Sequence, residues 1–311
     1  MKNVPCKCFA PASVANVAVG YDVLGFALEE LGDEIIINNG KEKGLKITLI
    51  RNNKAKLSKD ITKNVAGYAA WQLLKHLGLE DMPVEIELNK NLPVGTGLGS
   101  SASSAVAGAF AVNAFLGFPC KHQVVLRCAT MAEQIADGSW HADNVAPSLY
   151  GGFVLIRDNE TLDVVGLPTI PGLRAVVIFP HVQILTKDSR NILSDNVSLE
   201  NHVKQSGNLA AFVAAMYKSD IELLGRSLED LIIEPQRAKL IPNFYDLKEI
   251  AMKEGALGFS ISGAGPSMFA LCANTVIAEN IVDKTQNFFD ANNKNVTIYN
   301  SAINLEGAKK Y

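Results

Sequence analysis

The sequence predicts an α+β protein with two domains. Its 311 residues, nearly half of them apolar, are enough for two hydrophobic cores of ordinary size. Stretches with the two-residue alternation of strands are mixed along the chain with stretches that carry one apolar helical face. A Pro/Gly-rich segment at 166–172 separates a predicted first domain, residues 1–165, from a second, residues 166–311.

Asn16 and Asp22 are isolated polar residues in the otherwise apolar segment 8–28. Such side chains must find hydrogen-bond partners or face a cleft. Taken alone, the segment is equally consistent with a loop built on Asx turns. After it, the strands of the first domain are predicted at 34–38, 45–50, 84–88 and 153–156.

The helices of the first domain are predicted at 63–77, 102–115 and 121–137. The first has its apolar residues on one face, with Thr62 placed to cap its start and Gly78 to end it. The second is built largely from Ala, Val and Phe without Pro, which is typical of a buried helix, and Ser100 stands in the capping position. Residues 141–152 are rich in turn-forming residues.

The second domain begins with a buried strand at 174–179, followed by a polar loop at 186–190. Helices are predicted at 199–217, 220–231, 243–254 and 279–292. Further strands are predicted at 259–261, 268–272 and 296–299. The second domain is therefore also expected to be α+β.

The composition excludes several classes of protein. The formal net charge of −3 offers no basic surface, so nucleic acid is not an expected partner. Five scattered cysteines without C-x-x-C spacing indicate reduced thiols. The N-terminus lacks the apolar core of a signal peptide, and the longest apolar stretch, 105–118, is too short to span a bilayer. We therefore expect a cytoplasmic protein without membrane contact.

Three glycines at alternate positions, Gly95, Gly97 and Gly99, run into Ser100 and Ser101 between a predicted strand and a predicted helix. Glycines allow the backbone to approach a ligand closely, and the N-terminus of a helix attracts anions. The loop therefore indicates a phosphate site. The same residues would also let a helix pack close to a sheet, and the loop alone leaves this alternative open.

Two other kinds of phosphate site do not fit. A P-loop needs Gly-Lys-Ser/Thr, and no lysine occurs between Lys90 and Lys121. Residues 97–102 match the dinucleotide pattern G-x-G-x-x-A, which calls for a strand ending in an acidic residue about 20 residues later. The chain has Gly117-Phe-Pro119 there instead, so a Rossmann domain is not expected.

Three segments resemble the GHMP kinases, a superfamily of ATP-dependent kinases of small molecules. They are Pro11-Ala-Ser-x-Ala-Asn16, Pro93-x-Gly-x-Gly-Leu-Gly-Ser-Ser101 and Gly263-Ala-Gly-Pro266. Four further segments resemble the homoserine kinase family within this superfamily. They are Asn16-x-x-x-Gly-Tyr-Asp22, His141-x-Asp-Asn-Val-Ala-Pro147, Thr186-Lys-x-x-Arg190 and Glu234-Pro-x-Arg-x-x-Leu-Ile-Pro242.

The resemblance implies a fold and an activity. The fold is a ribosomal-protein-S5-like N-terminal domain with a left-handed βαβ unit, a ferredoxin-like C-terminal domain, and an active site between them. The activity is phosphorylation of the side-chain hydroxyl of L-homoserine by ATP, in a direct in-line transfer that gives O-phospho-L-homoserine on the route to threonine. A homodimer is also implied.

On the donor side, the resemblance implies a site for ATP and Mg²⁺. The nucleotide is expected to contact Asn64, Pro93, Val94, Gly95, Thr96, Gly97, Leu98, Gly99, Ser100, Ser101 and Gly263. The metal is expected to bind Glu133 and the hydroxyls of Ser100 and Ser101, because Mg²⁺ prefers hard oxygen ligands. Which of the two serines touches the metal is open.

On the acceptor side, the resemblance implies a site for a zwitterion that carries a hydroxyl. Arg237 and Arg190 are expected to meet the carboxylate, since a guanidinium pairs with a carboxylate through two hydrogen bonds. Asp22, Asn16 and Asn144 are expected to hold the amino and hydroxyl groups.

The catalytic residues implied are Asn144, Thr186 and Arg190, which would act by positioning. Phosphoryl transfer passes through a loose transition state, so alignment and charge neutralisation can supply most of the rate. Asp143 is the candidate general base, because related kinases of the superfamily use an aspartate. Our preferred hypothesis is that Asp143 is structural.

The chain departs from the family pattern at four positions. Ala18 and Asn243 stand where glycine is common, while Ala142 and Ser194 stand where proline is common. None of these changes removes a chemical group from the implied site. Two other functions stay open: a GHMP kinase for mevalonate, a sugar or shikimate, and a non-catalytic nucleotide- or metabolite-binding protein on the same fold.

Overall fold

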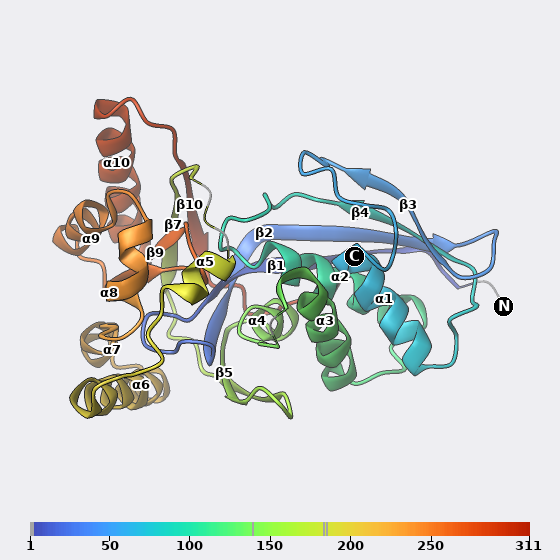
Figure 1. The fold of residues 1–311 in the computed structure, drawn as a ribbon, viewed down its shortest axis with the longest axis horizontal. Coiled ribbons are helices and arrows are strands. Elements are labelled where there is room, and N and C mark those ends of the chain that lie inside the picture. Colours follow the sequence, from blue (N-terminus) through green and yellow to red (C-terminus); the bar gives the residue numbers. More distant parts are fainter. Residues whose placement is uncertain (1–2, 139, 183, 185) are drawn as a thin grey trace.

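The structure, a computed structural model, describes residues 3–138, 140–182, 184 and 186–311, without the side chains of residues 136, 137 and 186. The chain forms two lobes, each built on its own β-sheet and packed with helices (Figure 1). Both lobes mix strands with helices, which confirms the predicted α+β class.

The larger sheet forms the N-terminal lobe. Its strands are β1 (Cys6–Ala15), β2 (Leu24–Asn39), β3 (Leu45–Arg51), β4 (Val84–Asn89), β5 (Phe153–Asp158), β6 (Asp163–Leu167) and β11 (Lys309–Lys310). They follow the order β11-β1-β2-β4-β3, while β5 pairs with the first residues of β2 and with β6. Within the described chain, β3 and β4 form the parallel pair, and the connection between them contains a helix, as a parallel pair requires.

The helices of this lobe are α1 (Val65–His76), α2 (Ser100–Phe115), α3 (His122–Asp137) and α4 (Val145–Tyr150). The central one is α2, which is buried along nearly its whole length and packs against α1, α3, β1 and β2. Gly108 allows the close crossing of α1 and α2, because a Cβ there would lie 2.1 Å from the carbonyl oxygen of Ala66. An almost fully buried helix thus holds Ser100 and Ser101 in a fixed place.

The C-terminal lobe has an antiparallel sheet of order β10-β7-β9-β8. Its strands are β7 (Arg174–Phe179), β8 (Gly258–Ile261), β9 (Met268–Cys272) and β10 (Thr297–Ala302). Its helices are α5 (Thr186–Asn191), α6 (Leu199–Lys218), α7 (Ile221–Ser227), α8 (Glu234–Arg237), the short 3₁₀ helix η1 (Ala238–Leu240), α9 (Phe244–Lys253) and α10 (Thr275–Ala291). In Figure 1, α5 lies between the two lobes.

Both predicted N-terminal helix caps of the first lobe are wrong, whereas Gly78 follows the end of α1 as predicted. Asn64, not Thr62, caps α1, because its Oδ1 accepts hydrogen bonds from two backbone N–H groups of the first turn at 3.1 and 3.3 Å. The residue before α2 is Gly99 in a left-handed conformation, and Ser100 is the first residue of the helix. The hydroxyl of Ser100 instead accepts a hydrogen bond from Lys90.

Three loop predictions are also wrong in part. Within 8–28, residues 6–15 form β1 and β2 starts at Leu24, which leaves only a turn between them. The loop predicted at 186–190 forms most of α5, and the turn-rich segment 141–152 contains α4. The cause is the same in each case: β1 is buried on both faces and the helices are only six residues long, so neither shows a clear sequence period.

The division into 1–165 and 166–311 stays a prediction. Residue 165 lies inside β6, which pairs with β5, and β11 returns from the C-terminus to pair with β1. The last residues of the chain therefore extend the N-terminal sheet. In the described part of the chain, no helix has the length and apolarity needed to cross a bilayer.

Candidate active site

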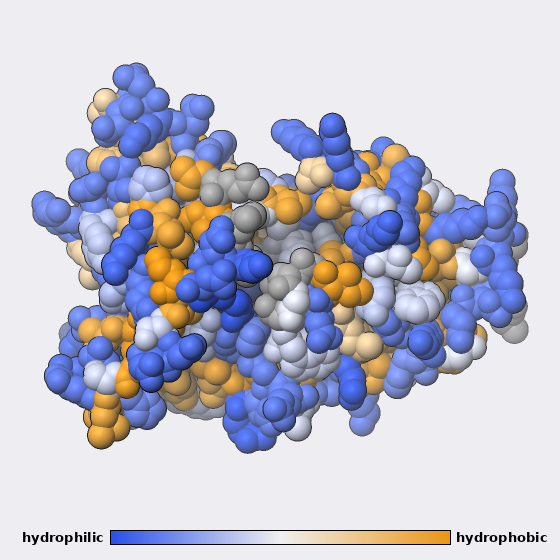
Figure 2. Space-filling model, in the orientation of Figure 1, coloured by the Kyte–Doolittle hydropathy of each residue, from blue (hydrophilic) through white to orange (hydrophobic). Residues whose placement is uncertain are grey.

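A cavity of about 500 Å³ lies between the glycine loop, α3, α5, α8 and the loop before β9. The molecular surface is hollowed in this region, between the two lobes (Figure 2). The predicted residues that line the cavity are Asn16, Asp22, Asn64, Val94, Gly95, Thr96, Gly97, Gly99, Ser100, Ser101, Glu133, Asp143, Asn144, Arg190, Arg237 and Gly263. The two predicted half-sites thus share one cavity.

Three predicted residues are placed elsewhere or lie outside the description. Leu98 is fully buried in the hydrophobic core, where its carbonyl oxygen accepts a hydrogen bond of 3.1 Å from the backbone N–H of Ser13. Pro93 is not among the residues that line the cavity. The side chain of Thr186 lies outside the described residues, so its predicted role stays a prediction.

The glycine loop needs its glycines for two different reasons. Gly95 has φ of 74° and open space where a Cβ would stand, so the backbone conformation alone requires glycine there. Gly97 has φ of 79°, and a Cβ would lie only 2.6 Å from the carbonyl oxygen of Ser262. The Ser262 hydroxyl in turn donates to the carbonyl oxygen of Gly97 at 2.6 Å. The glycine loop of one lobe is therefore locked onto the β8–β9 loop of the other.

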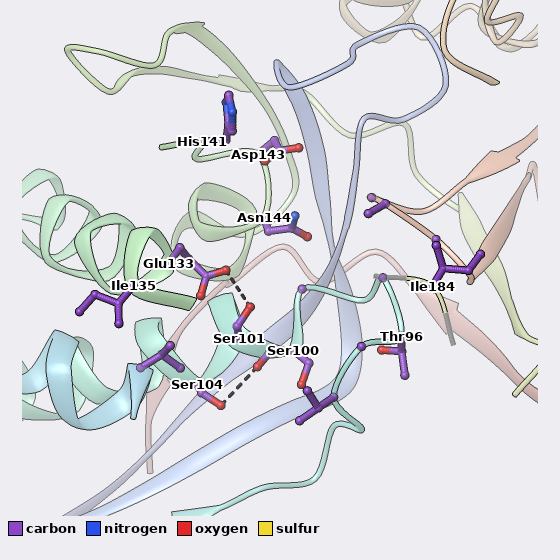
Figure 3. Close-up of a pocket in the computed structure, with 18 of the residues that line it drawn as sticks. Thr96, Ser100, Ser101, Ser104, Glu133, Ile135, His141, Asp143, Asn144 and Ile184 are labelled. Atoms are coloured by element: carbon purple, nitrogen blue, oxygen red, sulfur yellow. Dashed lines mark hydrogen bonds between the residues drawn. The ribbon is translucent and has the colours of Figure 1, made fainter. Parts of the chain in front are cut away.

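Asn144 stands where the donor and acceptor halves meet. A Cβ on Gly99 would lie 2.7 Å from Asn144 Oδ1, so the end of the glycine loop touches this amide. The Ser13 hydroxyl donates to the same oxygen at 2.9 Å and fixes the side chain. Figure 3 shows Asn144 between Asp143 on one side and Ser100 and Ser101 on the other. Its amide is thus held at the point where the two predicted half-sites adjoin.

Ser101 and Glu133 line the cavity side by side, and the hydroxyl of Ser101 donates to Glu133 Oε2 at 2.8 Å (Figure 3). Ser100 makes different contacts. Its hydroxyl and carbonyl oxygens accept hydrogen bonds from Lys90 Nζ at 2.7 and 2.9 Å. The structure therefore separates the two serines, which the sequence could not do.

Lys90 and Asp33 form a buried ion pair beneath the glycine loop. The sequence analysis did not predict this pair. Both side chains are almost inaccessible to water. Asp33 Oδ1 accepts from the backbone N–H groups of Asn91 and Leu92, and Oδ2 accepts from Lys90 and from the Ser104 hydroxyl. Burial lowers the pKa of Lys90, and the charge of Asp33 opposes this shift. The pair fastens β2, β4 and the first turn of α2 together.

Asp22 and Arg190 form the centre of the acceptor half. Arg190 donates from Nη1 and Nη2 to the two carboxylate oxygens of Asp22, each at 3.2 Å. His141 Nε2 lies 3.6 Å from Asp22 Oδ2. Arg190 also donates to the hydroxyl of Tyr21 at 2.9 Å. The structure thus brings together the two predicted charge partners of a zwitterion.

Arg237 is a buried cation, with only 3% of its surface exposed. Its Nε donates to the carbonyl oxygen of Ser189 at 2.9 Å, and its Nη1 to that of Gly263 at 3.0 Å. The guanidinium carbon lies 5.0 Å from the centre of the Tyr21 ring, which suits a cation–π contact. Burial lowers the pKa of Arg237. Its orientation is therefore fixed by the protein before any ligand binds.

Asn16 holds the backbone of the loop between β1 and β2, which carries Asp22. Its Nδ2 donates to the carbonyl oxygen of Gly263 at 2.8 Å, and its Oδ1 accepts from the backbone N–H of Asp22 at 3.0 Å. Asn16, Val17 and Ala18 all have positive φ, a conformation that favours glycine or asparagine. Contact between Asn16 and the acceptor stays a prediction, because this geometry gives its amide a structural task.

Asp143 is buried beside Asp22. The pKa of Asp143 is raised to about 7: burial is the main cause, the charge of Asp22 acts in the same direction, and that of Arg190 opposes both. A carboxyl group with such a pKa exchanges its proton near neutral pH. The geometry therefore allows Asp143 to be either a general base or a neutral structural group.

The four departures from the family pattern have local explanations. Ala18 and Asn243 have φ of 58° and 61°, which accounts for the glycine common at these positions. The backbone N–H of Ala142 donates to Asn159 Oδ1 at 3.0 Å, and that of Ser194 donates to Gln236 Oε1 at 2.8 Å. A proline would have no N–H to donate, so each of these two changes adds a hydrogen bond.

Comparisons with known proteins agree with the geometry of this cavity. Residues 64–152 match the family model of the GHMP kinases N-terminal domain, and residues 212–291 match that of the GHMP kinases C-terminal domain. These matches cover more than half of the chain. The protein therefore belongs to the GHMP kinases.

Individual relatives narrow the class. The chain is 42% identical to homoserine kinase of Chloroherpeton thalassium, over 97% of this chain and 98% of that protein. A crystal structure of homoserine kinase from Cytophaga hutchinsonii has 46% identity and a TM-score of 0.95, covering 99% of this chain and 97% of that one. The chain is a member of the homoserine kinase family. The fold alone is shared with Leishmania major mevalonate kinase, at 18% identity and a TM-score of 0.72 over 96% of this chain and 95% of that one.

Proposed function

We propose that this protein transfers the γ-phosphoryl group of ATP to the side-chain hydroxyl of L-homoserine, giving O-phospho-L-homoserine and ADP. The observation that carries the proposal is the position of Asn144. Its amide touches the end of the phosphate loop and lies in the same cavity as the Asp22–Arg190 pair. A donor phosphate and an acceptor hydroxyl would therefore meet at one polar, fixed group.

The donor half suits the phosphates of a nucleotide. The first N–H groups of α2 have no partner within the helix, and the helix dipole adds positive potential at this end. Gly95 leaves open space beside the backbone where a phosphate can approach closely. Asn64 and Val94 line the same cavity, where the nucleoside part of ATP would contact them.

The cavity also fits Mg²⁺. A carboxylate and a hydroxyl, from Glu133 and Ser101, face each other with 2.8 Å between their oxygens. Protein sites for Mg²⁺ supply one or two such oxygens, and the remaining ligands are phosphate and water. Ser100 is less suitable, because the ammonium group of Lys90 lies 2.7 Å from its hydroxyl oxygen. When bound, the metal would neutralise charge on the phosphates.

The acceptor half suits a zwitterion. Asp22 would bind an ammonium group, while Arg190 and Arg237 would bind a carboxylate. Neither a neutral sugar nor mevalonate, which carries no amine, would satisfy all three groups. These charges favour homoserine over the other acceptors of GHMP kinases.

Catalysis would rest on positioning, since a loose phosphoryl transition state needs alignment and charge stabilisation more than a strong base. Asn144 would orient the hydroxyl, and Arg190 would fix the acceptor and offset negative charge. Thr186 belongs to the same proposal through its sequence motif. In this mechanism Asp143 is a structural group and does not act as the general base.

One assay tests the proposed function. The release of ADP from Mg-ATP is measured with homoserine, mevalonate, galactose and shikimate as acceptors. We expect release that depends on homoserine and not on the other three. No acceptor-dependent ADP from any of them would favour the non-catalytic alternative. A homodimer in the cytoplasm is part of the same proposal, and the mass of the native particle in solution tests its dimeric state.

A further inference from the structure

Gln205 links the two lobes behind the acceptor site. It lies on α6, and only 9% of its surface is exposed. Its side-chain nitrogen donates to the carbonyl oxygen of Val19 at 3.2 Å and to Asp230 Oδ1 at 3.0 Å. Its side-chain oxygen accepts from the backbone N–H of Leu231 at 3.0 Å. These three hydrogen bonds of the buried amide thus all go to segments that lead to the cavity.

The first segment is the loop between β1 and β2, which presents Asp22. Asn16, Val17 and Ala18 adopt left-handed backbone conformations, which are unfavourable for most residues other than glycine. Such a loop keeps its shape only where surrounding contacts determine it. Val19 follows these three residues directly. The hydrogen bond from Gln205 therefore holds the loop at a point between its left-handed residues and Asp22.

The second segment leads into α8, which presents Arg237. Asp230 is buried and accepts hydrogen bonds from three successive backbone N–H groups, those of Ile232, Ile233 and Glu234, at 2.8 to 3.0 Å. It therefore organises the first turn of this four-residue helix, which is too short to be stable alone. Gln205 holds Asp230 in place, and with it the start of the helix.

We infer that Gln205 is a positioning residue that sets the separation between the Asp22 loop and the Arg237 helix, and so the affinity for the acceptor. It does not line the cavity, and its partners belong to the acceptor side alone. The glycine loop is held by separate contacts, to Ser262 and Ser13. A change at Gln205 should therefore be felt by homoserine and not by ATP. This inference rests on the proposed function.

The test is the substitution Gln205→Glu, which preserves the size of the side chain. It keeps an acceptor for Leu231, removes both donated hydrogen bonds, and places a carboxylate against Asp230. We expect the KM for homoserine to rise about three- to thirtyfold, the effect of one or two lost hydrogen bonds. The KM for ATP should change by less than about twofold, because other contacts hold the glycine loop. A general loss of structure would instead raise both KM values. Gln205→Met, which is uncharged, should raise the homoserine KM in the same direction.

One further variant completes the experiment. Asn208→Asp is the matched control, because Asn208 lies one turn along α6 and donates to the carbonyl oxygen of Glu229 at 3.0 Å, away from the cavity. It should leave both KM values unchanged.

The outcomes separate this inference from the proposed function. A wild-type protein that forms no ADP with homoserine contradicts the proposed function itself. An active wild type whose two Gln205 variants keep the normal homoserine KM, or raise both KM values equally, overturns the role of Gln205 alone. Melting temperatures of all variants identify any that are unfolded, and calorimetric binding of homoserine gives the same comparison without turnover.

Discussion

Arg190 and Asp22 form a two-pronged ion pair inside the cavity, with both nitrogen–oxygen distances at 3.2 Å. In the proposed function these are the groups that recognise opposite ends of the acceptor. A zwitterion can exchange this internal pair for two ion pairs with its own charges, so neither partly buried side chain is left without a partner. An acceptor with one charge leaves the other side chain unmatched, which is costly where water has limited access.

Acceptors that lack either charge should therefore be poor substrates. 4-Hydroxybutanoate lacks the amine of homoserine, and 3-aminopropan-1-ol lacks the carboxylate. We expect kcat/KM to fall at least about 100-fold for each, because a site built around polar groups strongly rejects analogues that leave them unpaired. Steady-state ADP release measures this. Near-normal kcat/KM for either analogue would contradict the assigned roles of Asp22 and Arg190.

Asp143→Asn should lower kcat by no more than about tenfold, because positioning carries most of the rate of a loose phosphoryl transfer. The amide has nearly the same shape and no charge, so it preserves a structural role and removes a basic one. The measurement is kcat at saturating homoserine, together with the homoserine KM. A loss of several orders of magnitude at unchanged KM would show that Asp143 is a general base.

The same variant has a pH-dependent effect on stability. The pKa of Asp143 is raised from 3.8 to about 7 in the folded protein, so the folded state holds this proton more tightly than the unfolded state. The stabilisation that comes from this proton is complete below the lower value and is lost as the pH rises through the higher one. Relative to wild type, Asp143→Asn should therefore gain stability between about pH 5 and pH 8. Urea unfolding at both pH values tests this, and a constant difference would contradict it.

Lys90→Met should destabilise the protein strongly. It leaves the carboxylate of Asp33 buried without its counter-ion, and breaking one partner from a buried pair costs about 3–5 kcal/mol. The double variant Lys90→Met with Asp33→Asn should recover part of this loss in the free energy of unfolding, because the amide has no charge and its oxygen still accepts from the backbone N–H groups of Asn91 and Leu92. Lys204→Met is the control, because Lys204 pairs with Glu200 at the exposed surface and should have little effect. Equal losses at both lysines would argue against the importance of burial.

Gly97→Ala should cost more stability than Gly95→Ala. Both residues have positive φ, which costs an alanine about 1–2 kcal/mol. Only at Gly97 would the added Cβ also press on backbone oxygens, those of Ser262 at 2.6 Å and Gly265 at 2.8 Å. Denaturant unfolding should therefore rank the two variants in this order. The reverse order would show that the loop is not locked to the β8–β9 loop.

The sequence predicted most long elements, because their apolar residues repeat with a strand or helix period. It also predicted the glycine loop as a phosphate site, since glycines let the backbone approach a ligand and the start of a helix attracts anions, and this role stays a prediction. It failed for β1, which is buried on both faces, and for α4 and α5, which are too short to show a period. Local pattern is informative only where one face of an element differs from the other.

The sequence by itself determined the family, the residue types of the two half-sites and the charge pattern that favours a zwitterion, because motifs keep their spacing along the chain. Only the tertiary structure decided how these residues are held. Lys90 is 57 positions from Asp33, and Gln205 is 186 positions from Val19. Such contacts depend on how β2, β4 and α6 pack, and no local period records that packing. The separate partners of Ser100 and Ser101 also follow from it.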